Sequence, residues 1–232
     1  MSKFRQYAKW TGIFFLIPDI ASIPALILFQ PLLRHDDFIT SSSANETQIL
    51  VGVFLEILVA LAVAGTALTL YPVLKKQNQP MALGYVVLRA MEATVIMVGI
   101  LSLLAVLTLR QDFLATNADP SVYQAIGKAL VAVKDWTFTF GPGIILPVNA
   151  TLLGYLLLKS KVVPRAIALI ALIDGPILLV SGIAFLFGAY EQYSPLPALL
   201  AMPMLVFEVW FSVRLITKGF NPSAVAALDK KG

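Results

Sequence analysis

The segment that decides the fold is residues 49–71, ILVGVFLEILVALAVAGTALTLY. Its only charged residue is Glu56, and it is longer than the roughly 20 apolar residues that an α-helix needs to span a bilayer. A carboxyl group near the middle of a membrane costs roughly 2.5–3.5 kcal/mol on insertion scales. The segment therefore predicts a transmembrane helix whose acidic residue serves packing or function.

Stretches of this kind cover most of the chain and predict an all-α, polytopic protein, a bundle of six transmembrane helices in a single domain over residues 1–232. The chain is 59% hydrophobic and only 13% charged, whereas soluble domains carry about 25% charged residues. The first stretch follows basic residues but lacks an A-x-A cleavage pattern, so we expect a retained helix rather than a signal peptide. The expected spans are residues 8–29, 48–74, 81–109, 136–158, 165–189 and 196–217, followed by a cytoplasmic tail over 219–232.

The basic residues fall mainly on one side of the predicted membrane. That side carries Lys3, Arg5, Lys9, Lys75, Lys76, Lys159, Lys161, Arg165, Lys218, Lys230 and Lys231. The other side mixes Arg34, Arg110 and Lys128 with Asp36, Asp37, Glu46, Asp112, Asp119 and Glu191. Because cytoplasmic loops are enriched in lysine and arginine, both termini are predicted to be cytoplasmic. The basic residues lie beside apolar stretches, so their expected partner is the lipid bilayer and not a nucleic acid.

Aromatic residues are expected to anchor the helices at both membrane interfaces. The inner set is Tyr7, Trp10, Tyr71, Tyr85 and Tyr155, and the outer set is Trp136, Tyr190 and Tyr193.

The fourth span is expected to be broken or bent, because Gly141-Pro142-Gly143 and Pro147 interrupt it. Asp119-Pro120 predicts a helix start well before this span. A helix continuous from there to Leu158 would be roughly 58 Å long at about 1.5 Å per residue, nearly twice the hydrocarbon core of a bilayer. We therefore expect residues 121–134 to form an interfacial segment on the outer surface, with an extension above the membrane as the alternative.

Polar and ionisable side chains lie deep in nearly every span. Arg89 and Glu92 are three residues apart on one helix, so their side chains share a face and are expected to pair. Glu56 and Glu208 have no basic residue within a helical turn. For each of these residues the alternative is a structural role in helix packing. The candidates for ligand binding or proton transfer are Asp19, Glu56, Arg89, Glu92, Asn149, Asp174 and Glu208.

Asp19 and Asp174 lie next to prolines, at Pro18-Asp19 and Asp174-Gly175-Pro176. Proline inside a membrane helix frees a backbone carbonyl group that a side chain or water must satisfy. An aspartate at such a position either serves the backbone alone or, as in carriers with broken helices, contributes to a ligand site.

The chain contains no cysteine and one histidine, His35. Disulfides, thiolate nucleophiles and cysteine-containing metal sites are therefore excluded. No G-x-S-x-G nucleophile elbow occurs either. We predict no catalytic residue, no metal site and no cofactor, and we do not expect an enzyme.

An excess of acids over bases inside the membrane implies protonated carboxyl groups, a bound cation or a water-filled cavity. Our leading hypothesis is a multi-pass protein that binds or carries a small or lipid-like ligand in an acidic interior, with coupling to protons. The alternative is a non-catalytic subunit or assembly factor of a larger complex, in which a membrane-protein partner or a second copy of the chain supplies the bases. An intramembrane enzyme is the third hypothesis. The first hypothesis requires the acids to converge on one cavity.

Several short motifs carry a resemblance to a known family. They are Leu70-Tyr71-Pro72, Leu88-Arg89-Ala90-Met91-Glu92, Pro164-Arg165, Phe207-Glu208 and Lys218-Gly219-Phe220. Their order over almost the whole chain is similar to an uncharacterised bacterial family of six-helix integral membrane proteins, the domain of unknown function number 4386. The resemblance implies a place in the bacterial cytoplasmic (inner) membrane. It brings no activity, substrate or catalytic residue.

Overall fold

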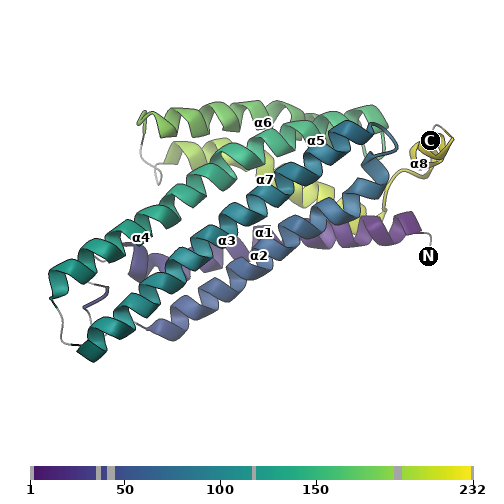
Figure 1. Ribbon diagram of the computed structural model, residues 1–232. Helices are drawn as coiled ribbons and strands as arrows, with labels where there is room; N and C mark the ends of the chain where they lie inside the picture. Colours follow the sequence, from purple (N-terminus) through teal and green to yellow (C-terminus); the bar gives the residue numbers. More distant parts are fainter. Residues whose placement is uncertain (1–2, 35–37, 41–44, 117–118, 191–194, 231–232) are drawn as a thin grey trace.

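The computed structural model describes residues 3–34, 38–40, 45–116, 119–190 and 195–230 and shows an elongated bundle of helices (Figure 1). No β-strand occurs in these residues. Six residues to which the sequence assigned loop or interface positions lie outside the described parts of the chain. They are His35, Asp36, Asp37, Glu191, Tyr193 and Lys231.

Six helical runs are long and apolar enough to cross a membrane, so the chain is a multi-pass membrane protein. In chain order they are α1 (Lys3–Arg34), α2 (Glu46–Leu74), α3 (Gln79–Thr116), the run of α4 (Pro120–Phe140), η1 (Gly141–Ile145) and α5 (Leu146–Ser160), then α6 (Arg165–Leu186) and α7 (Pro195–Thr217). A short helix, α8 (Pro222–Asp229), follows the last of them.

The membrane-spanning helices form a closed ring. Each packs against the next along the chain, and α7 returns to pack against α1. Arg5 stabilises the contact between α1 and α7. Its guanidinium donates hydrogen bonds to the carbonyl oxygens of Leu215 and Ile216 at the end of α7, at 3.2 and 2.9 Å. The last carbonyl groups of a helix lack partners within it, and Leu215 O also accepts a hydrogen bond from the backbone N–H of Gly219 at 3.1 Å. The ring leaves an interior in which side chains from several helices face one another.

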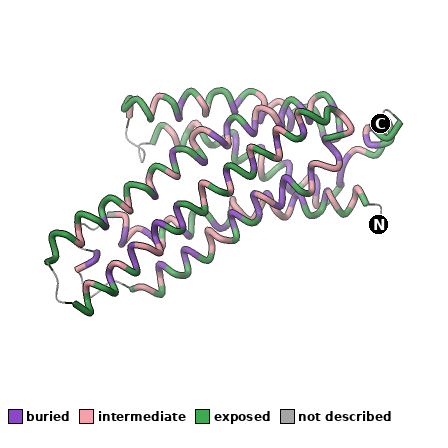
Figure 2. The backbone as a smooth tube through the Cα atoms, viewed as in Figure 1, coloured by how far each residue is buried: buried purple, intermediate pink, exposed green. Residues whose placement is uncertain are grey.

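The outside of the ring is apolar, as contact with lipid requires. Leu61, Leu68 and Val180 are 64, 72 and 67% exposed, and Figure 2 shows exposed residues along the outer side of every long helix. A soluble monomer rarely exposes apolar surface on this scale. The pattern therefore fits a bilayer environment.

The interface anchors predicted from the sequence divide into two groups. Trp10 and Tyr155 are 53 and 38% exposed, as an anchor must be. The prediction is wrong for Tyr85, which is completely buried. Its hydroxyl group finds its partners inside the bundle, so this tyrosine faces the interior and not the headgroup region.

α4, η1 and α5 follow one another without a gap from Pro120 to Ser160. Pro142 has no backbone N–H, and the chain around it takes the wider π-helical turn η1 instead of an α-helical one. Residues 121–134 belong to α4 and run directly into residues 135–140. They extend the helix rather than forming a separate element, because α3 extends equally far and offers a surface on which α4 packs.

The start of α4 is fixed by Asp119, as the sequence predicts. The Asp119 carboxylate accepts hydrogen bonds from the backbone N–H and the hydroxyl of Ser121, at 2.9 and 2.8 Å. These hydrogen bonds favour the ionised carboxylate and hold the pKa of Asp119 below its ordinary value of 3.8. Pro120 occupies the first turn, where its missing N–H costs nothing.

Candidate functional site

Arg89 and Glu92 form an ion pair inside the bundle. Arg89 Nη1 lies 3.0 Å from Glu92 Oε2, and both side chains are almost completely buried. Asn149 of α5 donates a hydrogen bond from Nδ2 to the same carboxylate oxygen at 3.5 Å. Three candidates from the sequence therefore meet, and Asn149 joins α5 to the pair on α3.

Residues of α1, α2 and α3 hold the Arg89 guanidinium in place. Its Nε donates a hydrogen bond to the Tyr85 hydroxyl at 3.3 Å, and this hydroxyl donates to Thr66 on α2 at 3.3 Å. On its other side the guanidinium stacks over the ring of Phe15 on α1, 5.1 Å from the centroid. A cation over an aromatic face is stabilised by about 0.5–2 kcal/mol. Arg89 therefore points inwards and does not reach the membrane interface.

Glu56 pairs with a residue that the sequence placed outside the fourth span. Lys134 Nζ lies 2.5 and 2.7 Å from the two carboxylate oxygens of Glu56. Lys134 is buried, and its ammonium also lies 5.4 Å from the centre of the Phe29 ring. The sequence predicts a base from another helix, because Glu56 has no basic residue within a turn of its own helix. It does not predict that this base is Lys134.

Asp19 and Glu208 bring two carboxyl groups together. Asp19 on α1 and Glu208 on α7 point towards one another, and their carboxyl groups lie close enough to interact. Two carboxyl groups can share a hydrogen bond only when one of them carries a proton. Neither residue takes part in a salt bridge with another residue of the described chain. Arg89 is close enough to interact electrostatically with both.

These groups line one cavity of about 360 Å³, here called the acidic cavity. Its ionisable lining residues are Asp19, Glu56, Arg89, Glu92, Lys134, Asp135 and Glu208. They come from α1, α2, α3, α4 and α7, so the cavity exists only when the ring is closed. The remaining wall is largely apolar and aromatic, with Phe14, Phe15 and Phe138 among its residues. A cavity of this size and lining lies within the range of small-molecule sites, about 300–1,000 Å³.

Asn149 contacts Glu92 from α5 but is not among the residues that line the acidic cavity. Asp174 is the candidate that the structure places away from all of these groups. It is buried between α6 and α7 and does not line the acidic cavity. Its carboxyl group lies near the backbone N–H of Met204 on α7, and its Oδ2 has no hydrogen-bond partner in the described chain. The role of Asp174 stays a prediction.

The acidic cavity contains more acids than bases. Five acids face two bases there. Glu92 is paired with Arg89 and Glu56 with Lys134, and neither salt bridge includes Asp19 or Glu208. No group of three or more acidic or histidine side chains in the described chain is arranged to hold a metal ion. Chemically, the carboxyl pair can hold either a proton or an organic cation that donates hydrogen bonds to both oxygens.

Comparisons with known proteins agree with the resemblance read from the sequence. The family model described as "Domain of unknown function (DUF4386)" matches residues 10–219. Neither the curated proteins nor the solved structures gave a match. The matched region contains every residue of the acidic cavity. This multi-pass membrane protein therefore belongs to the DUF4386 family.

Proposed function

We propose that this protein binds a small organic cation in the acidic cavity and exchanges it for a proton. The observation that carries the proposal is the Asp19–Glu208 pair, two neighbouring carboxyl groups that line the acidic cavity and take part in neither of its salt bridges. The positive charges of Arg89 and Lys134 are fixed to the chain and held in salt bridges. A proton shared by two carboxyl groups, in contrast, can leave the cavity without breaking either salt bridge.

The exchange conserves charge. When an ammonium group enters, it donates hydrogen bonds to both carboxylates, and the proton that the pair held leaves to water. The charge of the cavity is then the same before and after binding. This matters because an unpaired charge inside a membrane is costly. The apolar part of the cavity wall would contact the hydrocarbon part of the ligand.

The buried acids find their partners within this chain. Glu56 and Glu92 pair with bases on α4 and α3, and Asp19 pairs with Glu208. The hypothesis of a non-catalytic subunit rested on acids that need bases from another chain. That need does not arise for Glu56 and Glu92, whose bases lie on this chain. The Asp19–Glu208 pair alone can still take up a cation, and we assign that cation to a ligand.

The test uses butylammonium as the probe and butanol as its uncharged control, with the purified protein in lipid nanodiscs. A ligand that binds only the folded protein stabilises it by about 2.7 kcal/mol at 100 times its dissociation constant. We expect butylammonium, and not butanol, to raise the unfolding temperature. Asp19→Asn and Glu208→Gln should lose this effect. Asp174→Asn, a buried acid outside the cavity, should keep it.

Proton exchange is measured by titration calorimetry in two buffers of different ionisation enthalpy. We expect about one proton to be released for each butylammonium bound, because binding is linked to the proton of the pair. Equal stabilisation by butanol, or an unchanged effect in Glu208→Gln, would refute cation binding. Binding without proton release would refute the exchange.

A further inference from the structure

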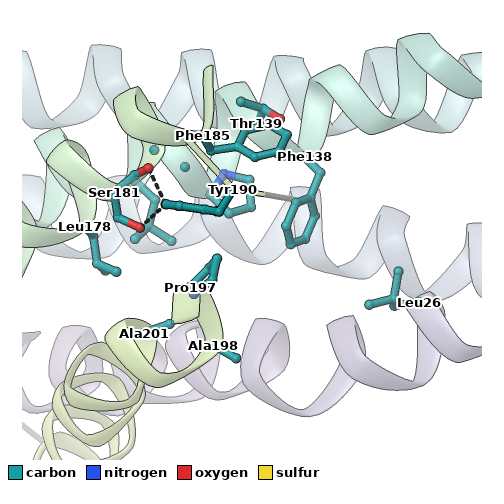
Figure 3. A pocket seen from close by; sticks show the side chains of 14 residues that line it. Leu26, Phe138, Thr139, Leu178, Ser181, Phe185, Tyr190, Pro197, Ala198 and Ala201 are labelled. Carbon is teal, nitrogen blue, oxygen red and sulfur yellow. Dashed lines mark hydrogen bonds between the residues drawn. The ribbon is translucent and has the colours of Figure 1, made fainter. Parts of the chain in front are cut away.

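A second cavity of about 510 Å³ adjoins the first. It lies between α6, α7 and the segment where α4 ends and η1 begins. Figure 3 shows Ala198 and Ala201 of α7 facing it from one side and Ser181 of α6 from the other. Its lining contains no charged residue. We call it the apolar cavity.

The polar side chains of the apolar cavity already have hydrogen-bond partners. The Thr139 hydroxyl donates to the carbonyl oxygen of Asp135 at 3.4 Å. The hydroxyl groups of Ser181 and Tyr190 are hydrogen-bonded, and the Tyr190 hydroxyl also bonds the carbonyl oxygen of Ser181 (Figure 3). These groups therefore have little capacity left for a ligand. The surface that remains is hydrocarbon, from residues such as Leu178, Phe185 and Ala201. A small, strongly hydrated cation would make no favourable contact with this surface.

The two cavities share part of their walls. Leu26, Phe138, Pro142 and Leu146 line both. A molecule that bridges this shared wall would have one end beside Asp19 and Glu208 and the other among apolar side chains. The combination matches an amphiphile, in which a charged head group is attached to a hydrocarbon chain.

The apolar cavity reaches the surface of the bundle, because Phe138, Ala198 and Ala201 in its lining are exposed. α7 packs on α1 and α6, whereas α4 packs on α3 and has little contact with α6 or α7. Figure 1 shows the α6–α7 pair diverging from α4 towards the end of the molecule away from the termini. A hydrocarbon chain moving from the bilayer into the apolar cavity exchanges one apolar environment for another, so the step requires no dehydration.

We propose that the apolar cavity holds the hydrocarbon chain of an amphiphile whose ammonium head group lies in the acidic cavity. This inference rests on the proposed function, and it names the ligand class as a long-chain amine that enters from the membrane. The acidic cavity selects the head group by charge. The apolar cavity accommodates the chain.

The test compares two probes on the same protein in nanodiscs. The first is butylammonium, which is too short to reach far beyond the acidic cavity. The second is dodecylammonium with a photoreactive diazirine at the end of its chain, which reports by mass spectrometry where the chain end lies. Ala201→Phe fills the apolar cavity from an exposed position on α7, and Ala201 does not line the acidic cavity. Leu199→Phe is the matched control, because Leu199 is 69% exposed and lines neither cavity.

We expect the chain end to label walls of the apolar cavity such as Leu178 and Phe185. This labelling should be lost in Ala201→Phe and in Glu208→Gln and kept in Leu199→Phe. Butylammonium should stabilise Ala201→Phe as it does the unchanged protein, which also shows that the variant folds. Labels spread over lipid-facing residues such as Leu61 and Leu68, unaffected by Ala201→Phe, would overturn the inference.

The failures of the two proposals are distinguishable. If butylammonium binds but the chain end is not localised, only the amphiphile inference fails. If butylammonium does not bind, the proposed function fails. If Glu208→Gln labels the apolar cavity as strongly as the unchanged protein does, the site takes chains without an ammonium group, and the inference is overturned.

Discussion

Arg89 carries one of the two positive charges that face the carboxyl groups of Asp19, Glu56, Glu92 and Glu208 in the acidic cavity. It is paired with Glu92, hydrogen-bonded to Tyr85 and stacked on Phe15. Without it, Glu92, Asp19 and Glu208 would lose a compensating charge inside the bundle. At the scale of single residues, the ionisation of the cavity therefore depends on this guanidinium.

Replacing Arg89 tests this dependence. Removing one partner of a buried ion pair typically costs about 3–5 kcal/mol, because the other charge is left uncompensated. We expect Arg89→Met to lower the free energy of unfolding by that amount. The double variant Arg89→Met/Glu92→Gln should recover part of the loss, because it removes both charges. Unfolding by a denaturing detergent in mixed micelles measures the difference. A double variant no more stable than Arg89→Met would contradict the expectation.

At the scale of elements, η1 and α6 approach each other through two glycines. A Cβ atom built on Gly182 would collide with the carbonyl oxygen of Gly143. Small residues permit such close approach between membrane helices, where packing and not hydrophobic burial drives association. The contact places η1, which carries Pro142, against α6 beside the apolar cavity.

Gly182→Ala is the variant that tests this contact. Because the neighbouring atoms are backbone and cannot rotate away, we expect a loss of at least about 1–3 kcal/mol in the free energy of unfolding. Gly84→Ala is the matched control in α3, since its added Cβ would lie 3.5 Å from Leu152 Cδ2, an ordinary contact. That variant should be neutral or slightly more stable, because alanine favours helix over glycine. Equal stability of the two variants would show that the helices separate without cost.

At the scale of the whole molecule, the start of α1 and the short helix α8 lie at the same end of the bundle (Figure 1). The lysine-rich turn between α2 and α3 and the turn after α5 lie at that end too. An even number of crossings returns the chain to the side on which it started, and the excess of lysine and arginine predicts that this side is cytoplasmic.

The lack of cysteine in the chain allows a direct test of orientation. We expect Asp112→Cys, at the far end of α3, to react with a membrane-impermeant maleimide on intact cells. Ser223→Cys, on α8, should react only after the cells are opened. Both positions are exposed in the structure, so access through the protein does not limit either reaction. The reverse pattern of labelling would show that the termini face outwards.

The pairings within the cavity were predictable to different degrees. Arg89–Glu92 follows from a spacing of three on one helix, which fixes the geometry whatever surrounds it. Glu56–Lys134 and Asp19–Glu208 join residues 78 and 189 positions apart, and nothing local specifies them. They depend on which helices are neighbours and on how each is rotated about its own axis. Tyr85 was assigned to the interface for the same reason, because depth along a helix is readable from sequence and rotation is not.

Six apolar stretches long enough to cross a membrane, and the charged residues within them, can be read from the sequence alone. Length and hydropathy act within one helix, so they can be read from the order of residues alone. Only the tertiary structure decided that Asp19, Glu56, Glu92 and Glu208 meet in one cavity and that Asp174 does not. In lipid, apolar side chains on different helices are nearly interchangeable. The choice of neighbours therefore rests on close packing and on a few polar contacts between helices, and both exist only when the ring is assembled.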